Sequence, residues 1–363
     1  MIFRIDRRLL QNVDWALLAA AGAIVALSVL SLWGLAWGGG SGIAFRQLGW
    51  VGVGLGALVV VASLDYRTVV RAAPALYVAG LGLLVTVFIL GRTVSGARRW
   101  IHAGPLTVQP SELFKLIFVL TLAWALTLRW ARPLSGATLA WTVGLAVVPF
   151  LLVVRQPDLG TALVLLPVLA AVLLGVGLRL KVLAVLALGA VAATPLAWLA
   201  LKAYQRERLL VYLDPFRDPL GTAYNVIQAK IAIGSGQLLG KGVSGATQSR
   251  LAFLPERHTD FIFAVFAEMW GFVGCLVLLL AYGLLVLRGF EIAAGAREPR
   301  GRIVALGVTA LFATQTLINL GMVTGLLPVV GIPLPLMSYG GSSMVVSLMG
   351  LGLLLSVRMR QFQ

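Results

Sequence analysis

The sequence predicts an all-α, polytopic integral membrane protein. Of its 363 residues, 60% are hydrophobic and only 12% are charged, whereas soluble domains carry about 25% charged residues. Apolar stretches of about 20 residues, the length that a helix needs to cross a bilayer, recur along the whole chain. A soluble protein of this size has no core large enough for all of them. We therefore expect a single membrane domain over residues 1–363.

Ten apolar segments, bounded by charged residues or by Gly and Pro clusters, are long enough to span a bilayer. Within lipid the backbone can satisfy its own hydrogen bonds only as a helix. The expected helices are 15–37, 45–64, 73–90, 112–128, 136–154, 158–177, 182–201, 261–287, 303–323 and 342–357. The Pro- and Gly-rich stretch 328–343 breaks the helical pattern, so its backbone should be buried in protein or line a cavity.

Basic residues indicate which side of the membrane each loop faces. Loops on the N-terminal side of the bundle contain two to four Lys or Arg residues each, and such an excess marks the cytoplasmic side. Ten spans place both termini on that side, and the long loop at about 202–259 on the outer side. This topogenic signal accounts for the inward basic residues, so no nucleic-acid partner is expected.

Cysteine and histidine are too few for several classes of site. Cys275 has no partner for a disulfide, and His102 and His258 alone do not predict a zinc site. A divalent cation, Mg or Mn, would have to bind carboxylates or substrate phosphates. The sequence lacks a phosphate-binding P-loop motif, so no nucleotide cofactor is expected.

Carboxylates cluster at the outward ends of the predicted helices. Glu112, Asp158 and Asp260 each begin a helix, Glu268 lies about two turns deeper than Asp260, and Lys115 follows Glu112. Ionisable residues in membrane segments usually mark functional sites. A transporter would need such groups along a path through the midplane. The cluster therefore favours chemistry at the membrane surface on a lipid substrate.

Each of these residues also has a structural interpretation. An Asp before an apolar helix can cap it, which fits Asp158 and Asp260. Glu112 and Lys115 are three residues apart on one helix face, so they could form a structural ion pair. Both interpretations stay open at this point.

Two outward segments combine cations with aromatic residues. Arg98 and Arg99 precede Trp100, and paired guanidinium groups suit phosphate oxygens; Trp100 could stack on the substrate or anchor the segment at the interface. Arg257 and His258 stand beside Asp260 at the membrane surface, where a base and a cation could face a polar headgroup.

These residues lie in five motifs, GARRWI, QPSELFKL, RQPDLGTA, FLPERHTDFIFAVFAE and LPLMSYGGSS. In order and spacing the chain resembles the SEDS family (shape, elongation, division and sporulation) over nearly its whole length. The resemblance implies a ten-helix glycosyltransferase of the bacterial plasma membrane that polymerises lipid II on the outer face. It also implies a class B penicillin-binding protein and other elongation-complex proteins as partners.

The resemblance assigns residue roles. Asp260 matches an acid thought to be essential for polymerisation and is the candidate general base; Glu112 and Lys115 match a functionally sensitive pair. Family members commonly have two consecutive acids where this chain has Glu268 followed by Met269. The predicted substrate-binding residues are Arg98, Arg99, Trp100, Glu112, Lys115, Asp158, Arg257, His258 and Glu268.

The ERHTDF sequence favours the elongation branch of the family. The alternatives within the family are a division-specific or a sporulation polymerase. A lipid II flippase is an alternative of a different class, since polar residues such as Gln315 and Asn319 in a large bundle would serve it too.

Overall fold

The computed structural model describes residues 11–35, 42–94, 97–103, 106–128, 134–192, 195, 198–199, 203–214, 218, 221, 223–250, 254 and 256–361. Within these ranges nine helices are long and apolar enough to cross a membrane. They are α2 (Trp15–Leu35), α3 (Gly42–Ser63), α5 (Ala73–Leu90), α6 (Pro110–Leu128), α7 (Gly136–Arg155), α8 (Leu159–Val176), α15 (Ile262–Gly295), α16 (Pro299–Thr324) and α17 (Gly341–Met359). The predicted multi-pass, all-α membrane fold is confirmed.

The helix expected at 182–201 is described only in part. Helix α9 (Leu180–Ala192) covers its first half, and most of residues 193–202 lie outside the described ranges. At 13 residues α9 is shorter than the length a bilayer requires. The count of ten spans therefore stays a prediction at this one position.

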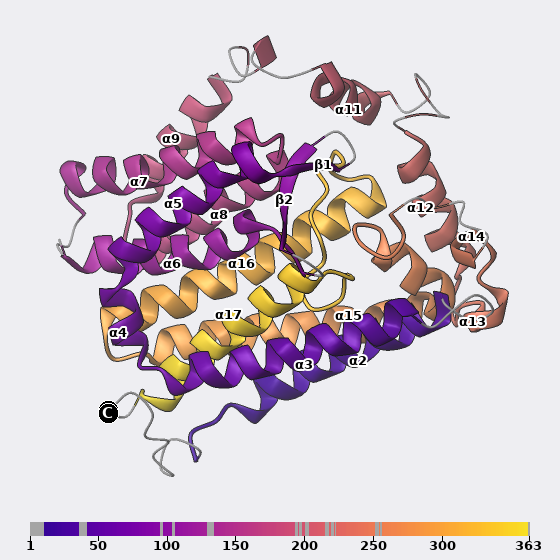
Figure 1. The fold of residues 1–363 in the computed structure, drawn as a ribbon, viewed down its shortest axis with the longest axis horizontal. Helices are drawn as coiled ribbons and strands as arrows, with labels where there is room; N and C mark the ends of the chain where they lie inside the picture. The colour runs from indigo at the N-terminus through magenta and orange to yellow at the C-terminus, as the bar shows by residue number, and fades with distance from the viewer. Residues whose placement is uncertain are drawn as a thin grey trace.

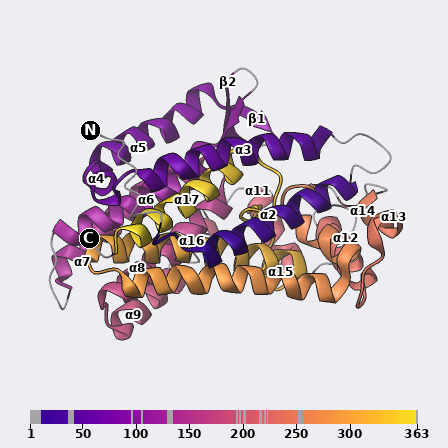
Figure 2. The same ribbon diagram turned by 90° about the horizontal axis from the view of Figure 1, so that it is seen from below.

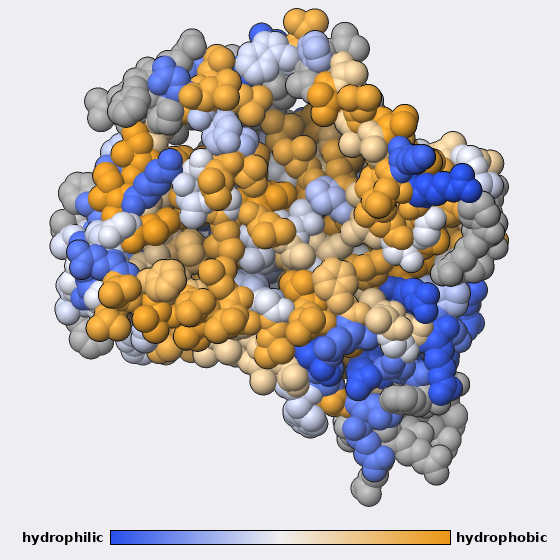
Figure 3. Space-filling view, turned by 180° about the vertical axis from the view of Figure 1, so that it is seen from behind, coloured by the Kyte–Doolittle hydropathy of each residue, from blue (hydrophilic) through white to orange (hydrophobic). Residues whose placement is uncertain are grey.

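The core of the bundle is formed by α6, α16 and α17, whose most apolar stretches are mostly buried, whereas most residues in the corresponding stretches of α3, α5, α7 and α15 are half-buried or exposed. The exposed side chains of these outer helices are apolar, for example Val78, Ile89 and Phe272. Figure 3 shows hydrophobic residues over most of one face, with the largest group of hydrophilic residues at its lower right. Such a surface requires lipid as its solvent.

The two ends of the bundle differ. One end, where the last helix α17 finishes, we call the terminal end. There the carboxylate of Asp14, just before α2, lies 2.6 Å from the Arg288 guanidinium of α15 and 4.0 Å from Arg358 of α17. Figure 2 shows α4 (Tyr66–Arg71) and the end of α17 at this same end. At the opposite end, which we call the site end, α6, α8, α15 and α17 begin.

A small antiparallel sheet lies at the site end, where the sequence predicted only a loop. Its strands β1 (Arg92–Val94), β2 (Ala97–Ala103) and β3 (Leu106–Val108) lie in sequence order. Trp100 pairs with Arg92, and Ile101 pairs with Val108. The sheet contacts α5, α6 and α17, so it fixes the segment that contains Arg99 and Trp100 against the bundle (Figure 1).

In its described residues the long loop at 202–259 contains four helices, α11 (Ala203–Leu213), α12 (Tyr224–Ser235), α13 (Gly242–Gly245) and α14 (Thr247–Arg250). Helix α12 packs against α15 and α16. The turn after α12 inserts at a break in α15 at Gly271, where φ is 63°. There the Phe272 amide donates to the Gln237 carbonyl at 2.8 Å. A side chain at Gly271 would place its Cβ 2.3 Å from the Gly240 nitrogen, so the close approach requires glycine.

Candidate functional site

The Pro- and Gly-rich segment between α16 and α17 is irregular and buried, as the sequence predicted. Its apolar residues Ile332, Leu334, Leu336 and Met337 are at most 1% exposed. Polar side chains of the surrounding helices hold its backbone carbonyls: Ser28 bonds Met337 at 2.5 Å and Tyr282 bonds Pro335 at 2.6 Å. This rigid segment forms one wall of the site end.

Asp260 lies against this wall. Asp260 precedes Phe261, the N-cap of α15, and its side chain is partly exposed. The Oδ2 atom would be 3.3 Å from a Cβ at Gly331, whose φ is +71°. Gly331 therefore adopts the left-handed backbone without strain, and its lack of a side chain lets the Asp260 carboxylate lie close to the wall. Phe261 and Phe263 are buried beside it.

Asn319 of α16 joins the two segments. Its side-chain amide donates to the backbone carbonyl of Asp260 at 2.9 Å and to that of Ile332 at 2.7 Å, while its Oδ1 atom is buried without a hydrogen-bond partner in the described structure. Ser338 adds a bond from its hydroxyl to the Thr259 carbonyl at 2.6 Å. The position of Asp260 is therefore fixed through its backbone.

His258 and Arg257 lie in the same segment. The His258 carbonyl accepts the Tyr339 amide at 2.8 Å, and the two rings meet edge to face with centroids 5.7 Å apart. Burial lowers the pKa of His258, although Glu256 acts in the opposite direction, so the imidazole is mainly neutral at pH 7. The Arg257 guanidinium donates to the Ser249 carbonyl of α14, which holds this cation against α14 within the long loop.

Asp158 joins the sheet, α6 and α8. It is 1% exposed and is the N-cap of α8, which confirms the capping interpretation. Its Oδ2 also accepts from the Gln109 amide at 3.0 Å and the Ser111 hydroxyl at 3.1 Å. The Arg99 guanidinium lies 3.6 Å from its Oδ1. Asp158 therefore holds Arg99, itself 21% exposed, in place at the site end.

Glu112 and Lys115 form the ion pair that their spacing predicted. The Lys115 Nζ lies 2.7 Å from Glu112 Oε1, and the two side chains are 3% and 2% exposed. Of the described residues, no other side chain pairs with either of them. On α6 the pair directly follows Ser111, whose hydroxyl donates to Asp158.

Glu268 contacts the long loop. Its two oxygens accept the backbone amides of Gln248 and Ser249, each at 2.9 Å, and it is completely buried. Lys241 lies 4.0 Å away. These bonds satisfy the free amides of α14 and hold that helix against α15. Substrate binding by Glu268 stays a prediction, and the contacts point to a positioning role.

We expect Glu268→Gln to loosen the loop. The amide keeps one acceptor oxygen and loses the other, so a buried amide of α14 is left without an acceptor, at a cost of about 1 to 3 kcal/mol. Limited proteolysis of the 202–259 loop and the melting temperature would measure this change. Glu291→Gln, an exposed carboxylate on the same helix, is the control. Equal behaviour of the two variants would contradict the role of Glu268.

The remaining predicted residues are described in part. Trp100 is half-buried on β2, and the side chains of Arg98 and His102 lie outside the described part of the structure. Sequence reasoning missed Gln109, Ser338 and Ser342. The Ser342 hydroxyl accepts the backbone amide of Gln109 at 3.1 Å. The signal that could have found these three residues is their place in the motifs QPSELFKL and LPLMSYGGSS. Among the described residues, no group of three or more His, Cys, Asp or Glu could hold a metal ion.

Comparison with known proteins identifies the family. A family model described as "Cell cycle protein", which covers FtsW, RodA and SpoVE, matches residues 8–363. The chain belongs to the SEDS family. Within SEDS proteins, peptidoglycan glycosyltransferase MrdB of Escherichia coli strain K12 is 42% identical over 347 residues, which are 95% of this chain and 93% of MrdB. Stage V sporulation protein E of Bacillus subtilis is 38% identical over 86% of each chain.

Solved SEDS structures have the same fold. A chain from a structure described as the structural coordination of polymerization and crosslinking by a peptidoglycan synthase complex matches with a TM-score of 0.82 and 38% identity, covering 97% of this chain and 99% of that one. The rod shape determining protein RodA of Thermus thermophilus matches with a TM-score of 0.74 and 34% identity, covering 97% and 98%. The resemblance read from the five motifs is confirmed.

Proposed function

We propose that this chain is a peptidoglycan glycosyltransferase that polymerises lipid II into glycan strands during cell elongation. The observation that carries the proposal is the 42% identity to the glycosyltransferase MrdB over 95% of the chain. The similarity to RodA, a rod shape determining protein, supports the elongation role. Division-specific FtsW relatives are also similar, at 38% identity over 85% of the chain.

Asp260 is the proposed general base. The hydroxyl of the acceptor sugar gives its proton to the Asp260 carboxylate while its oxygen attacks the anomeric carbon of the donor. The bond from that carbon to the lipid pyrophosphate breaks, and the pyrophosphate leaves with the electron pair. The partial exposure of Asp260 and its backbone anchoring by Asn319 support this role, because a base must reach the substrate and stay aligned.

Cations of the site end are proposed to stabilise the leaving pyrophosphate. Arg99 is held by Asp158, and Arg257 is held by the loop; Arg98 joins them by the sequence motif. Fixed guanidinium groups stabilise developing negative charge without having to reorganise. A divalent cation (Mg or Mn) stays part of the proposal only as an ion carried by the substrate's phosphates, and no step depends on it.

The proposed partner is a class B penicillin-binding protein, which would crosslink the strands. A similar chain occurs in a complex that couples polymerization with crosslinking, which supports this partner. The site end is proposed to face outward from the plasma membrane, with both termini in the cytoplasm, because lipid II is polymerised on the outer face and the arginines of the opposite side fit the positive-inside rule.

Purified protein supplied with lipid II tests the activity. We expect glycan strands to form in the absence of any other glycosyltransferase. Transfer of lipid II across vesicles without polymer would instead support the flippase alternative. In cells, depletion should cause rounding, whereas filamentation would point to a division-specific role.

Cysteine labelling tests the orientation. In a Cys275→Ala background, we expect a membrane-impermeant thiol reagent applied to intact cells to modify Thr247→Cys and not Ala294→Cys. Both positions are exposed in the structure, one in the long loop and the other at the terminal end of α15. The reverse pattern would overturn the outward placement of the site end.

A further inference from the structure

Ser249 of α14 connects a buried carboxylate to a cation of the site end. Its backbone amide donates to Glu268 Oε2 at 2.9 Å, and its hydroxyl donates to the same oxygen. On its other side, the Ser249 carbonyl accepts from the Arg257 guanidinium. Ser249 is itself completely buried. The path from Glu268 to Arg257 therefore runs through hydrogen bonds that all meet at one residue.

Glu268 is a fixed starting point for this path. It lies in the stretch of α15 from Ile262 to Met269, in which every residue is at most 6% exposed. Its Oε1 accepts the Gln248 amide at 2.9 Å and lies 4.0 Å from the Lys241 ammonium group. Its backbone carbonyl accepts the Lys241 amide at 2.9 Å. Hydrogen bonds and a nearby cation compensate the cost of burying the carboxylate, and they hold it in one orientation.

The bonds from Ser249 do more than attach the long loop. The amides of Gln248 and Ser249 alone would hold α14 against α15. The Ser249 hydroxyl adds a second bond from the same residue to the same oxygen, so this residue is fixed by its backbone and its side chain together. The direction of its carbonyl is fixed as a result, and that carbonyl is the acceptor for Arg257.

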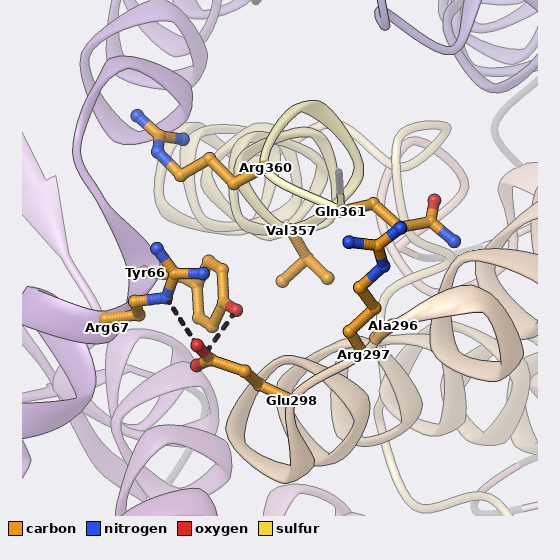
Figure 4. A pocket seen from close by; sticks show the side chains of 8 residues that line it. All are labelled: Tyr66, Arg67, Ala296, Arg297, Glu298, Val357, Arg360 and Gln361. Atoms are coloured by element: carbon orange, nitrogen blue, oxygen red, sulfur yellow. Dashed lines mark hydrogen bonds and ion pairs between the residues drawn. The ribbon is translucent and has the colours of Figure 1, made fainter. Parts of the chain in front are cut away.

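The contact between Ser249 and Arg257 differs from a direct ion pair. At the terminal end, Arg67 Nε lies 3.0 Å from Glu298 Oε1, and the Tyr66 hydroxyl donates to the other carboxylate oxygen at 3.4 Å (Figure 4). There the carboxylate that orients the arginine also offsets its charge. A carbonyl is a neutral acceptor, so the Ser249 contact orients the Arg257 guanidinium without offsetting its charge.

Orientation affects how well a guanidinium stabilises negative charge. Donors that are already in place need no reorganisation as charge develops in a transition state. The planar fork of arginine also matches phosphate oxygens only in a limited range of directions. The hydrogen bonds behind Arg257 therefore bear on the chemistry at the site end.

We propose that Glu268 and Ser249 are positioning residues that orient the Arg257 guanidinium toward the pyrophosphate of lipid II. This role rests on the proposed function, in which Arg257 stabilises the leaving pyrophosphate. Both residues act through Arg257 and contact no reacting atom. The role also explains why Glu268, which the motifs predicted to bind substrate, is completely buried.

A double-mutant cycle on purified protein tests the path. The measurement is the kcat of glycan synthesis from lipid II per folded molecule. We expect Arg257→Gln to lower kcat roughly a hundredfold, the usual effect of removing one donor to a developing charge. Glu268→Gln should lower kcat about tenfold, which corresponds to one hydrogen bond to a charged group. In the Arg257→Gln background, Glu268→Gln should change kcat by less than about twofold, because the group that Glu268 orients is gone.

Ser249→Ala makes a milder change at the centre of the path. It removes the hydroxyl bond to Glu268 and keeps the amide bond, so the loop stays attached. It should lower kcat several-fold, and this loss should also disappear in the Arg257→Gln background. The variant keeps the test decisive if Glu268→Gln does not fold. Thr247→Ala is the matched control, because it removes an exposed hydroxyl from the same helix and should be as active as the parent.

Additive losses would overturn the positioning role, since equal factors with and without Arg257 mean that Glu268 and Ser249 do not act through it. A purely structural role would lower the melting temperature and the folded fraction, and leave kcat per folded molecule unchanged. An Arg257→Gln variant as active as the parent would also overturn it. Glycan synthesis by the parent together with additive losses contradicts this role alone, whereas a parent that makes no glycan contradicts the proposed function.

Discussion

Asp260→Asn is expected to abolish nearly all polymerisation while the protein stays folded. Asparagine is close to aspartate in size, and the hydrogen bond from Asn319 goes to the backbone carbonyl of residue 260, which the substitution leaves in place. The N-cap of α15 is Phe261, so the helix start should not change. Asparagine cannot accept a proton at neutral pH, and general-base catalysis contributes roughly two to four orders of magnitude in rate.

The measurement is the rate of glycan synthesis from lipid II by purified protein, beside its melting temperature. Glu256→Gln is the matched control, because it removes an exposed carboxylate from the same segment and should leave the rate near that of the parent. A rate for Asp260→Asn within a few-fold of the parent would exclude Asp260 as the base. Asp158 or Glu268 would then have to be considered, although both are already occupied by hydrogen bonds.

Asn319 offers a second way to perturb the same base. Asn319→Leu removes the amide that joins the backbone of residue 260 to Ile332, without touching a reacting group. We expect a lower kcat with an unchanged pH profile, since the base would be misplaced and not altered. A purely structural role would lower the melting temperature and the amount of active protein, and leave the rate per folded molecule unchanged.

Helix positions could be predicted because the bilayer imposes a local length criterion. The range 73–90 coincides with α5 because apolar residues fill it and Gly91 follows. Helix α15 runs on to Gly295, beyond the predicted end at 287, because Arg288 does not end the helix: Asp14 pairs with it at 2.6 Å. Hydropathy locates the edge of the apolar layer, and a paired charge lets a helix continue past it.

Contacts between distant segments could not be predicted. The motifs identified Arg99, Asp158 and Asp260, but nothing local says that Arg99 reaches Asp158 or that Asn319 holds residue 260. The sheet was missed for the same reason, since strands of three to seven residues are stabilised by pairing and not by their own composition. The partners of Glu268 could not be predicted either, because the amides of Gln248 and Ser249 lie about 20 residues earlier in the chain.

Breaking the Glu112–Lys115 pair is expected to cause the largest loss of stability. The two side chains are almost completely buried, and removing one partner leaves an uncompensated charge among α6 and its neighbours. Glu112→Gln should therefore lower the free energy of unfolding by about 3 to 5 kcal/mol. The folded yield and the melting temperature would show it, with Glu291→Gln as the exposed control. A loss no larger than that of the control would mean that the pair does not stabilise the fold.

The double variant Glu112→Gln, Lys115→Met decides whether the pair is structural or functional. With both charges removed and the volume nearly kept, no buried charge is left unpaired, so stability should return to within about 1 kcal/mol of the parent. If the pair only stabilises the bundle, polymerisation should return with it. We expect instead a folded protein that uses lipid II poorly, because the family resemblance places Glu112 and Lys115 among the substrate-binding residues. Recovery of both stability and activity would show that the pair has no part in catalysis.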